Sequence, residues 1–373
     1  MRQYWKNIQK DSVIGILFLL FIFILPLFTL CGGTSMEERV KENAAEVLNN
    51  NGTMQNDDDI LETTTEKITE GDAFSDIQKS ITEFTQNLFL RSAFIEGNTA
   101  LTSFLTGGTY MESTQVLLGK ENWLFYKTQN DGFPIYDYMG INHFSEEEMK
   151  AMADNLTVTR DYLQNEKQVD FVVATIPNKE IVYEEYMPDT IARVDRCSRG
   201  QQFAQYMSEH TDVLYVYPLE AFYGQKGQYP LFYKTDTHWN HIGAFVGLQE
   251  IMRTKYGYGQ SPEEVVFAKE RHDFAGDLSV IAGVADQYAI DTVYAFDPQS
   301  VNPDYKRDEI AIVVGDSFGG FLSVTARGYY KEVYWIDTDD FTVSMVDEYD
   351  ADIVIWETVE RLQETYMQDS LLD

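Results

Sequence analysis

Two short segments of the chain hold the residue types of a nucleophilic catalytic site. Asp236 and His238 lie two residues apart in the stretch YKTDTHWNHIGAF, and Ser317 lies in the stretch GDSFGG, Gly315–Gly320. A serine hydroxyl is a weak nucleophile until a base removes its proton, and histidine has an ordinary pKa near neutral pH. A carboxylate is then needed to hold the imidazole in the required tautomer. Together these residues predict a Ser-His-Asp triad.

Each segment also has a purely structural interpretation. Asp236 or Asn240 is a suitable cap for the apolar helical pattern that follows, and Asp316 or Ser317 is a suitable cap for the next one. Gly-Asp-Ser is common in turns. The catalytic interpretation gains weight from the pair of segments, because an Asp-x-His pair in extended backbone places both side chains on one side, ready to serve a distant serine.

Further residues near these segments are candidates for contact with a substrate. The amides from Ser317 to Gly319 begin a predicted helix, where they are expected to face an oxyanion. Asn178 and Lys179 follow a predicted strand, so either is a candidate donor at the cleft, although a loop role is favoured over it. Trp239 is a candidate platform for a sugar ring, with core packing as the alternative.

Apolar runs alternate with helical patterns along the folded part of the chain. This alternation predicts an α/β layered sheet with mostly parallel strands and helices on both faces, and chemistry at the carboxyl ends of the strands. A hairpin is predicted at 116–126. Strands are predicted at 169–177, 213–218, 310–314, 332–337 and 352–357, and helices at 146–166, at 199–210, from Asn240 to near Gly257, and from Ser317 to Arg327.

Composition limits the classes of protein to which the chain can belong. The 373 residues are 44% hydrophobic and 14% aromatic, which is sufficient for a sizeable core, and the net charge of -33 argues against nucleic acid as a partner. The two cysteines, Cys31 and Cys197, do not form a disulfide framework. No Cys/His spacing indicates a metal site, and the triad needs no cofactor.

The N-terminal region predicts a membrane anchor. Residues 1–12 are basic and are expected in the cytoplasm, and residues 13–30 form an apolar run long enough to span a bilayer. A cleaved signal peptide or lipidation at Cys31 are the alternatives. Residues 31–86 are acidic and polar, which predicts a stalk, and residues 87–373 form the folded domain on the extracytoplasmic side of the cell membrane.

Several motifs together resemble a known family. GDSF after a buried strand is similar to the first block of SGNH hydrolases, but here the Asp-x-His pair precedes the serine. That rearranged order resembles the alginate O-acetyltransferase family of SGNH hydrolase-like proteins and its DHHW branch. Further matches are GKENWLFY at 119–126, IPNK at 176–179 and IVIWETVER at 353–361. The resemblance implies a three-layer α/β/α domain and a triad of Ser317, His238 and Asp236, with Thr237 where many DHHW proteins have a second histidine.

The sequence therefore predicts a membrane-anchored O-acetyltransferase that modifies a secreted or cell-surface polysaccharide through an acyl-serine. The resemblance implies a polytopic membrane acyltransferase of the MBOAT type as the acetyl donor. Two alternatives remain at this stage. A carbohydrate esterase would use the same triad with water as the acceptor, and a polysaccharide-binding or assembly protein would use no triad chemistry.

Overall fold

A computed structural model describes residues 113–128, 132–368 and 371–372 of the chain. All of these residues belong to one unit, 87–373. The predicted cytoplasmic segment 1–12, anchor 13–30 and stalk 31–86 lie outside the described residues. Among the helices that are described, none combines the length and the hydropathy required to cross a membrane.

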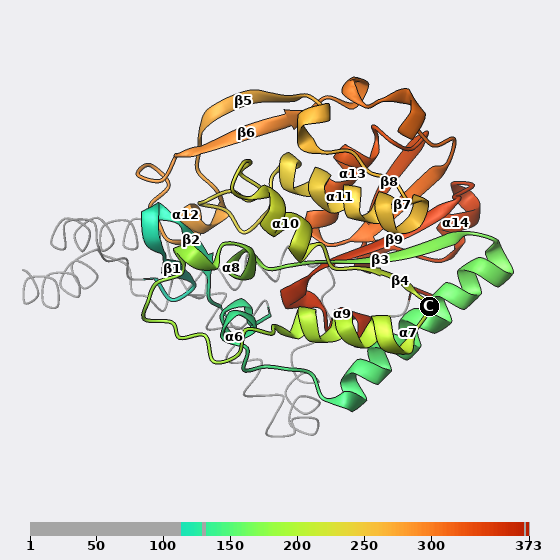
Figure 1. Ribbon diagram of the computed structural model, residues 1–373, viewed down its shortest axis with the longest axis horizontal. Helices are drawn as coiled ribbons and strands as arrows, with labels where there is room; N and C mark the ends of the chain where they lie inside the picture. Colours follow the sequence, from blue (N-terminus) through green and yellow to red (C-terminus); the bar gives the residue numbers. More distant parts are fainter. Residues whose placement is uncertain (1–112, 129–131, 369–370, 373) are drawn as a thin grey trace, which may run out of the picture. The chain divides into compact units, whose positions relative to one another are not determined.

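A five-stranded sheet forms the centre of the domain (Figure 1). Its strands run in the order β4-β3-β9-β7-β8, and every pairing is parallel. Their carboxyl ends therefore meet at one edge of the sheet, where the loops that carry chemistry are expected. The strands are β3 (Asp170–Ile176), β4 (Leu214–Val216), β7 (Ile310–Gly315), β8 (Glu332–Asp337) and β9 (Ile353–Val359).

Helices cover both faces of this sheet, as the sequence predicts (Figure 1). Alternate strand residues point to opposite faces, so each face has its own apolar core. The first face packs against α8 (Lys179–Val182), α10 (Leu219–Gln225), α11 (His241–Tyr256) and α13 (Ser317–Ala326). The second packs against α7 (Glu146–Tyr162), α9 (Arg199–His210), α14 (Ser344–Glu348) and α15 (Thr365–Gln368).

Local capping fixes the ends of the long helices. Ser145 and Glu148 form a reciprocal capping box at the start of α7, where the sequence predicts one. Asn240 accepts hydrogen bonds from two amides at the start of α11, which ends at Gly257 with φ of 78°. The predicted helix 146–166 corresponds to α7 and the helical turn Leu163–Lys167 that follows it.

Two hairpins flank the carboxyl edge of the sheet. The predicted one pairs β1 (Val116–Leu118) with β2 (Leu124–Tyr126). The other was not predicted and pairs β5 (Phe267–Phe274) with β6 (Asp291–Phe296). β5 is charged and mostly exposed, so it lacks the apolar run from which the other strands were predicted. The helices α6 (Pro134–Met139) and α12 (Asp277–Ile281) were also not predicted, and neither were α10, α14 and α15.

Candidate active site

Ser317 lies at a sharp turn from strand to helix. β7 ends at Gly315, Asp316 is the N-cap of α13, and Ser317 is the first helical residue, with an exposed side chain. A side chain at Gly315 would collide with Glu357, since its Cβ would lie 2.6 Å from the backbone oxygen of that residue. Glycine therefore allows β7 to approach β9 closely where the chain turns.

Asp236 and His238 lie on the loop that leads into α11. The carboxylate of Asp291, the first residue of β6, accepts hydrogen bonds from the amides of Lys234 and Thr235 at 2.8 Å each. The hydroxyl of Thr235 donates to the same carboxylate at 2.5 Å. The β5-β6 hairpin thus holds the start of this loop, and Asn240 fixes its end at the helix.

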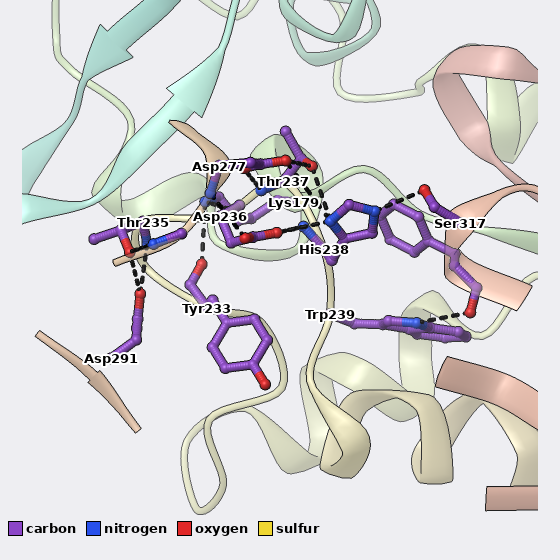
Figure 2. Close-up of polar contacts among 12 residues, drawn as sticks. Lys179, Tyr233, Thr235, Asp236, Thr237, His238, Trp239, Asp277, Asp291 and Ser317 are labelled. Carbon is purple, nitrogen blue, oxygen red and sulfur yellow. Dashed lines mark hydrogen bonds and ion pairs between the residues drawn. The ribbon is translucent and has the colours of Figure 1, made fainter. Parts of the chain in front are cut away.

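The structure brings Ser317, His238 and Asp236 together across 79 positions of sequence (Figure 2). His238 Nε2 lies 2.7 Å from Ser317 Oγ, and His238 Nδ1 lies 2.7 Å from Asp236 Oδ1. Asp236 Oδ1 also accepts the backbone N–H of His238 at 2.9 Å. The two imidazole nitrogens therefore face a hydroxyl on one side and a carboxylate on the other, which is the arrangement for general-base activation of a serine.

Two phenylalanine rings pack against the imidazole of His238. The centroid of the His238 ring lies 4.9 Å from that of Phe318 and 5.8 Å from that of Phe321. Both phenylalanines are on α13, so the helix that carries the nucleophile also positions the base. The His238 side chain is 20% exposed and that of Asp236 is 10% exposed, whereas Ser317 faces solvent.

A second carboxylate, Asp277, lies beside the imidazole (Figure 2). Its Oδ2 is 3.7 Å from His238 Nδ1 and accepts the hydroxyl of Thr237 at 2.5 Å. That hydroxyl is 3.2 Å from His238 Nδ1. Asp277 is separated from Asp236 by 41 positions and begins the short helix α12, which was not predicted, so no sequence pattern could identify it.

The carboxylate of Asp236 is held in its charged form. Burial acts to raise the pKa of Asp236, but the hydrogen bond and the charge of His238, with the N–H of Asp277, outweigh it and lower that pKa below its ordinary value. An ionised Asp236 is the form that can hold His238 Nδ1 as a donor, leaving Nε2 to accept the proton of Ser317.

Lys179 was a candidate donor to substrate, and the structure corrects this expectation. Its side chain is buried, and Nζ donates to the backbone oxygens of Tyr233, Lys234 and Asp236 at 3.1, 3.2 and 2.6 Å. All three ammonium protons are therefore used within the loop that carries Asp236. Burial lowers the pKa of Lys179 to about 8, although nearby carboxylates oppose this shift.

Asn178 and Trp239 also differ from the expectation of substrate contact. The amide of Asn178 is buried, donates to Asp137 at 2.6 Å and accepts from the N–H of Arg361 at 3.1 Å. Trp239 has 0% exposure, and its indole N–H donates to the backbone oxygen of Phe318 at 3.2 Å (Figure 2). Trp239 thus belongs to the core between α11 and α13, and no sugar ring can reach its face.

Gly319 was a candidate oxyanion donor, but its N–H donates to the backbone oxygen of Asp316 at 3.0 Å. The N–H of Phe318 is likewise occupied, by the carboxylate of Asp316 at 2.8 Å. Within the described chain no acceptor is bonded to the N–H of Ser317. The donor available at this helix start is therefore the amide of the nucleophile itself.

Asp236, His238 and Asp277 could together contact a metal ion, since their potential ligand atoms lie within 4.8 Å of one another. The described hydrogen bonds already use these atoms. A metal ion bound here would have to compete for His238 Nδ1, which Asp236 holds in the triad geometry.

The fold has solved relatives. A DHHW family protein from Eubacterium siraeum aligns with 13% identity and a TM-score of 0.50, over 69% of this chain and 99% of that one. The O-acetyltransferase domain of Pseudomonas putida AlgJ aligns with 18% identity and a TM-score of 0.44, over 69% and 93%. Pseudomonas aeruginosa AlgX aligns with 17% identity and a TM-score of 0.45, over 71% and 67%. No curated protein matches the chain significantly.

A family match gives the classification. The family described as the SGNH hydrolase-like domain of the acetyltransferase AlgX matches residues 116–319, a span that includes both the Asp-x-His loop and the turn at Ser317. The match covers more than half of the chain. The chain therefore belongs to the AlgX-type family of SGNH hydrolase-like acetyltransferase domains.

Proposed function

We propose that this protein is an O-acetyltransferase that transfers acetyl groups to hydroxyls of a polysaccharide through Ser317, His238 and Asp236. The observation that carries the proposal is the continuous contact from Asp236 Oδ1 to His238 Nδ1 and from His238 Nε2 to Ser317 Oγ, with 2.7 Å at each step. Family membership supports acetyl transfer as the reaction class.

The first half-reaction forms an acyl-serine. His238 Nε2 takes the proton of Ser317 Oγ as that oxygen attacks the carbonyl carbon of an acetyl ester. The oxyanion of the tetrahedral intermediate accepts a hydrogen bond from the N–H of Ser317 at the start of α13. The bond to the leaving group then breaks, and that group takes the proton from His238. Asp236 stabilises the imidazolium during this step.

The second half-reaction repeats these steps with a sugar hydroxyl. His238 Nε2 removes the proton of the sugar hydroxyl, whose oxygen attacks the acetyl carbon. The bond to Ser317 Oγ breaks, and the serine oxygen recovers its proton from His238. The sugar leaves as its acetyl ester, and the free triad is restored.

The predicted membrane anchor at 13–30 fits this role, because it would hold the domain near a membrane-embedded acetyl donor. A polytopic acyltransferase of the MBOAT type is the donor that we propose. In this arrangement the domain works outside the cytoplasm on a secreted or cell-surface polymer.

A carbohydrate esterase is the second candidate function. The exposed side chain of Ser317 favours it, because water reaches the nucleophile in the absence of a bound acceptor. The two functions share the first half-reaction and differ in whether water or a sugar hydroxyl attacks the acyl-serine.

The test uses the full-length chain with 4-nitrophenyl acetate and candidate oligosaccharides. Wild type is compared with Ser317→Ala and with the matched control Ser323→Ala. Ser323 lies on the same helix, but its hydroxyl donates to the backbone oxygen of Gly320 at 2.8 Å and takes no part in the triad. The products are acetylated sugar, free acetate and an acetyl group on the intact protein detected by mass.

Acetylated sugar from wild type and Ser323→Ala, but not from Ser317→Ala, supports transfer. Free acetate without acetylated sugar, with the same dependence on Ser317, supports the esterase. Equal activity in Ser317→Ala and wild type contradicts the assigned nucleophile and both functions.

A further inference from the structure

Trp335 exposes a large aromatic surface near the nucleophile. It is 43% exposed, whereas the other described tryptophans, Trp123, Trp239 and Trp356, are at most 4% exposed. Exposing an indole leaves one of the largest apolar side chains in water, so an exposed indole at the rim of an active site suggests a binding role.

The first turn of α13 leaves room for this indole. Trp335 lies on the edge strand β8, with its side chain on the face of the sheet that α13 covers. A Cβ at Gly319 would lie 3.0 Å from Trp335 Nε1 and 3.2 Å from Cδ1, and a Cβ at Gly320 would lie 3.9 Å from Cε2. The two glycines thus let the pyrrole edge of the indole rest on the helix backbone, while the rest of the ring system stays open.

Helix geometry places Trp335 and His238 on opposite flanks of Ser317. Successive helical residues rotate by about 100° around the axis. Phe318 and Phe321, which contact His238, therefore lie to one side of Ser317. Gly320 lies to the other side and Gly319 on the far side of the helix, and both adjoin Trp335. The indole therefore adjoins the first turn of α13 on the side away from His238.

The charges around this indole are negative. β8 ends at Asp337, directly opposite Gly315, and the exposed Asp339 and Asp340 follow it. The basic residues of the same elements lie at the far ends, with Lys331 before β8 and Arg327 after α13. A polymer with a carboxylate on each ring would be repelled here.

The buried cations Lys179 and Arg361, near the triad, do not reverse this negative charge. Lys179 is buried and bound to three backbone oxygens. The guanidinium of Arg361 lies 5.5 Å from the centroid of the Phe318 ring, and the side chain is 9% exposed. Asp316 and Glu357 are close enough to Arg361 for its charge to act on both carboxyl groups.

We propose that Trp335 forms the floor of an acceptor subsite, on which a hexose or hexosamine ring without a carboxylate stacks beside Ser317. This inference rests on the proposed acetyl transfer and specifies its substrate class. Carbon-bound hydrogens on one face of a sugar ring pack against the indole, and hydroxyls or an amine on its edge face Asp337. The acidic rim then selects neutral or amino-sugar polymers over polyuronates.

The experiment measures acetyl transfer by the full-length chain to a chito-oligosaccharide and to an oligomannuronate. Trp335→Ala and Trp335→Phe are compared with Tyr206→Ala, which removes an aromatic side chain from α9 on the opposite face of the sheet. Formation of acetyl-Ser317 from 4-nitrophenyl acetate is measured separately. This half-reaction tests the proposed function without the acceptor.

The expected result is a chito-oligosaccharide KM raised by about 5- to 10-fold in Trp335→Ala. Trp335→Phe is expected to lie between Trp335→Ala and wild type, and Tyr206→Ala to resemble wild type. Wild type is expected to acetylate the chito-oligosaccharide in preference to the oligomannuronate. In the Ser317→Ala background, chito-oligosaccharide should alter tryptophan fluorescence, and this change should disappear when Trp335→Phe is added.

Three outcomes would overturn the subsite. One is an unchanged acceptor KM in Trp335→Ala, and another is preference of wild type for the oligomannuronate. The third is loss of acetyl-Ser317 formation in Trp335→Ala, which would make the indole a structural support of α13. Failure of the proposed function is recognised differently, by wild type forming no acetyl-Ser317 at all.

Discussion

The ammonium nitrogen of Lys179 lies 2.6 Å from the backbone oxygen of Asp236, 57 positions further along the chain. Lys179 begins α8 just after β3, so this contact joins the carboxyl edge of the sheet to the loop that carries the acid and base of the triad. The rings of Trp123 and Phe125 also lie near the ammonium, at 5.6 and 5.4 Å. The buried ammonium therefore positions Asp236 through a hydrogen bond to the backbone oxygen of that residue.

Lys179→Met is expected to lower both stability and turnover. Methionine fills a similar volume but leaves the oxygens of Tyr233, Lys234 and Asp236 without their donor, at a cost of about 2 to 4 kcal/mol in the free energy of unfolding. Loss of this support should lower kcat more than it changes KM. Urea unfolding and acetyl transfer kinetics at a temperature where the variant is folded provide the measurements.

Lys226→Met is the matched control for this prediction. Lys226 also donates to a backbone oxygen, that of Val182, at 2.7 Å, but this contact lies outside the triad loop. The Lys226→Met variant should lose stability without a comparable fall in kcat. If folded Lys179→Met turns over like Lys226→Met, Lys179 supports the fold and does not position the triad.

The sequence was sufficient to predict features that depend on local patterns. The parallel strands were recognised from buried apolar runs, and α7 and α11 from Ser145 and Asn240 as caps. Asp236, His238 and Ser317 were identified because their chemistry is complementary, although 79 positions separate the base from the nucleophile.

The sequence could not predict the direction in which buried polar side chains point. Lys179 and Asn178 follow a strand, as a substrate-binding residue would, but tertiary packing turns both toward backbone and side-chain partners in the interior. Gly319 was expected to offer its N–H, which instead closes the first turn of α13. Asp277 and Trp335 come from segments that only the folded chain brings to the site.

Asp236→Asn should nearly abolish activity while the fold remains. An amide can donate to His238 Nδ1 and so favours the tautomer whose Nε2 carries a proton, which cannot accept the proton of Ser317. We expect kcat to fall by about three to four orders of magnitude. Acetyl-Ser317 formation measures the rate, and circular dichroism verifies the fold. A folded variant with a rate near that of wild type would show that Asp236 does not orient the base.

Asp277→Asn tests the second carboxylate beside His238. Its Oδ2 lies 3.7 Å from Nδ1, so it adds negative charge that stabilises the imidazolium. Removing this charge should reduce kcat by about 3- to 10-fold, because the imidazolium of His238 forms during each half-reaction.

The control for Asp277→Asn is Asp273→Asn. Asp273 is an exposed carboxylate on the same hairpin and pairs with Arg271 at 2.9 Å. Its substitution should leave kcat unchanged. Equal kcat values for Asp277→Asn and wild type would assign Asp277 to loop structure alone.

Glu357 should make the stability of the protein depend on pH. It is fully buried under the turn at Ser317, where the backbone N–H of Gly319 is close enough to stabilise its charged form slightly. Burial, reinforced by the charge of Asp316 and opposed by that of Arg361, raises its pKa well above the ordinary value of 4.5. The folded protein therefore keeps a proton on Glu357 at pH values where the unfolded chain has lost it.

This difference in bound protons sets the direction in which stability changes with pH. The stabilisation is complete below about pH 4.5 and declines as the pH rises toward the pKa of the folded state, by at most about 1.4 kcal/mol per pH unit. Glu357→Gln should remove this slope, whereas the exposed Glu348→Gln should retain it. Urea unfolding of the three proteins at several pH values above 4.5 measures the slope. The same slope in Glu357→Gln as in wild type would mean that Glu357 is already ionised in the folded protein.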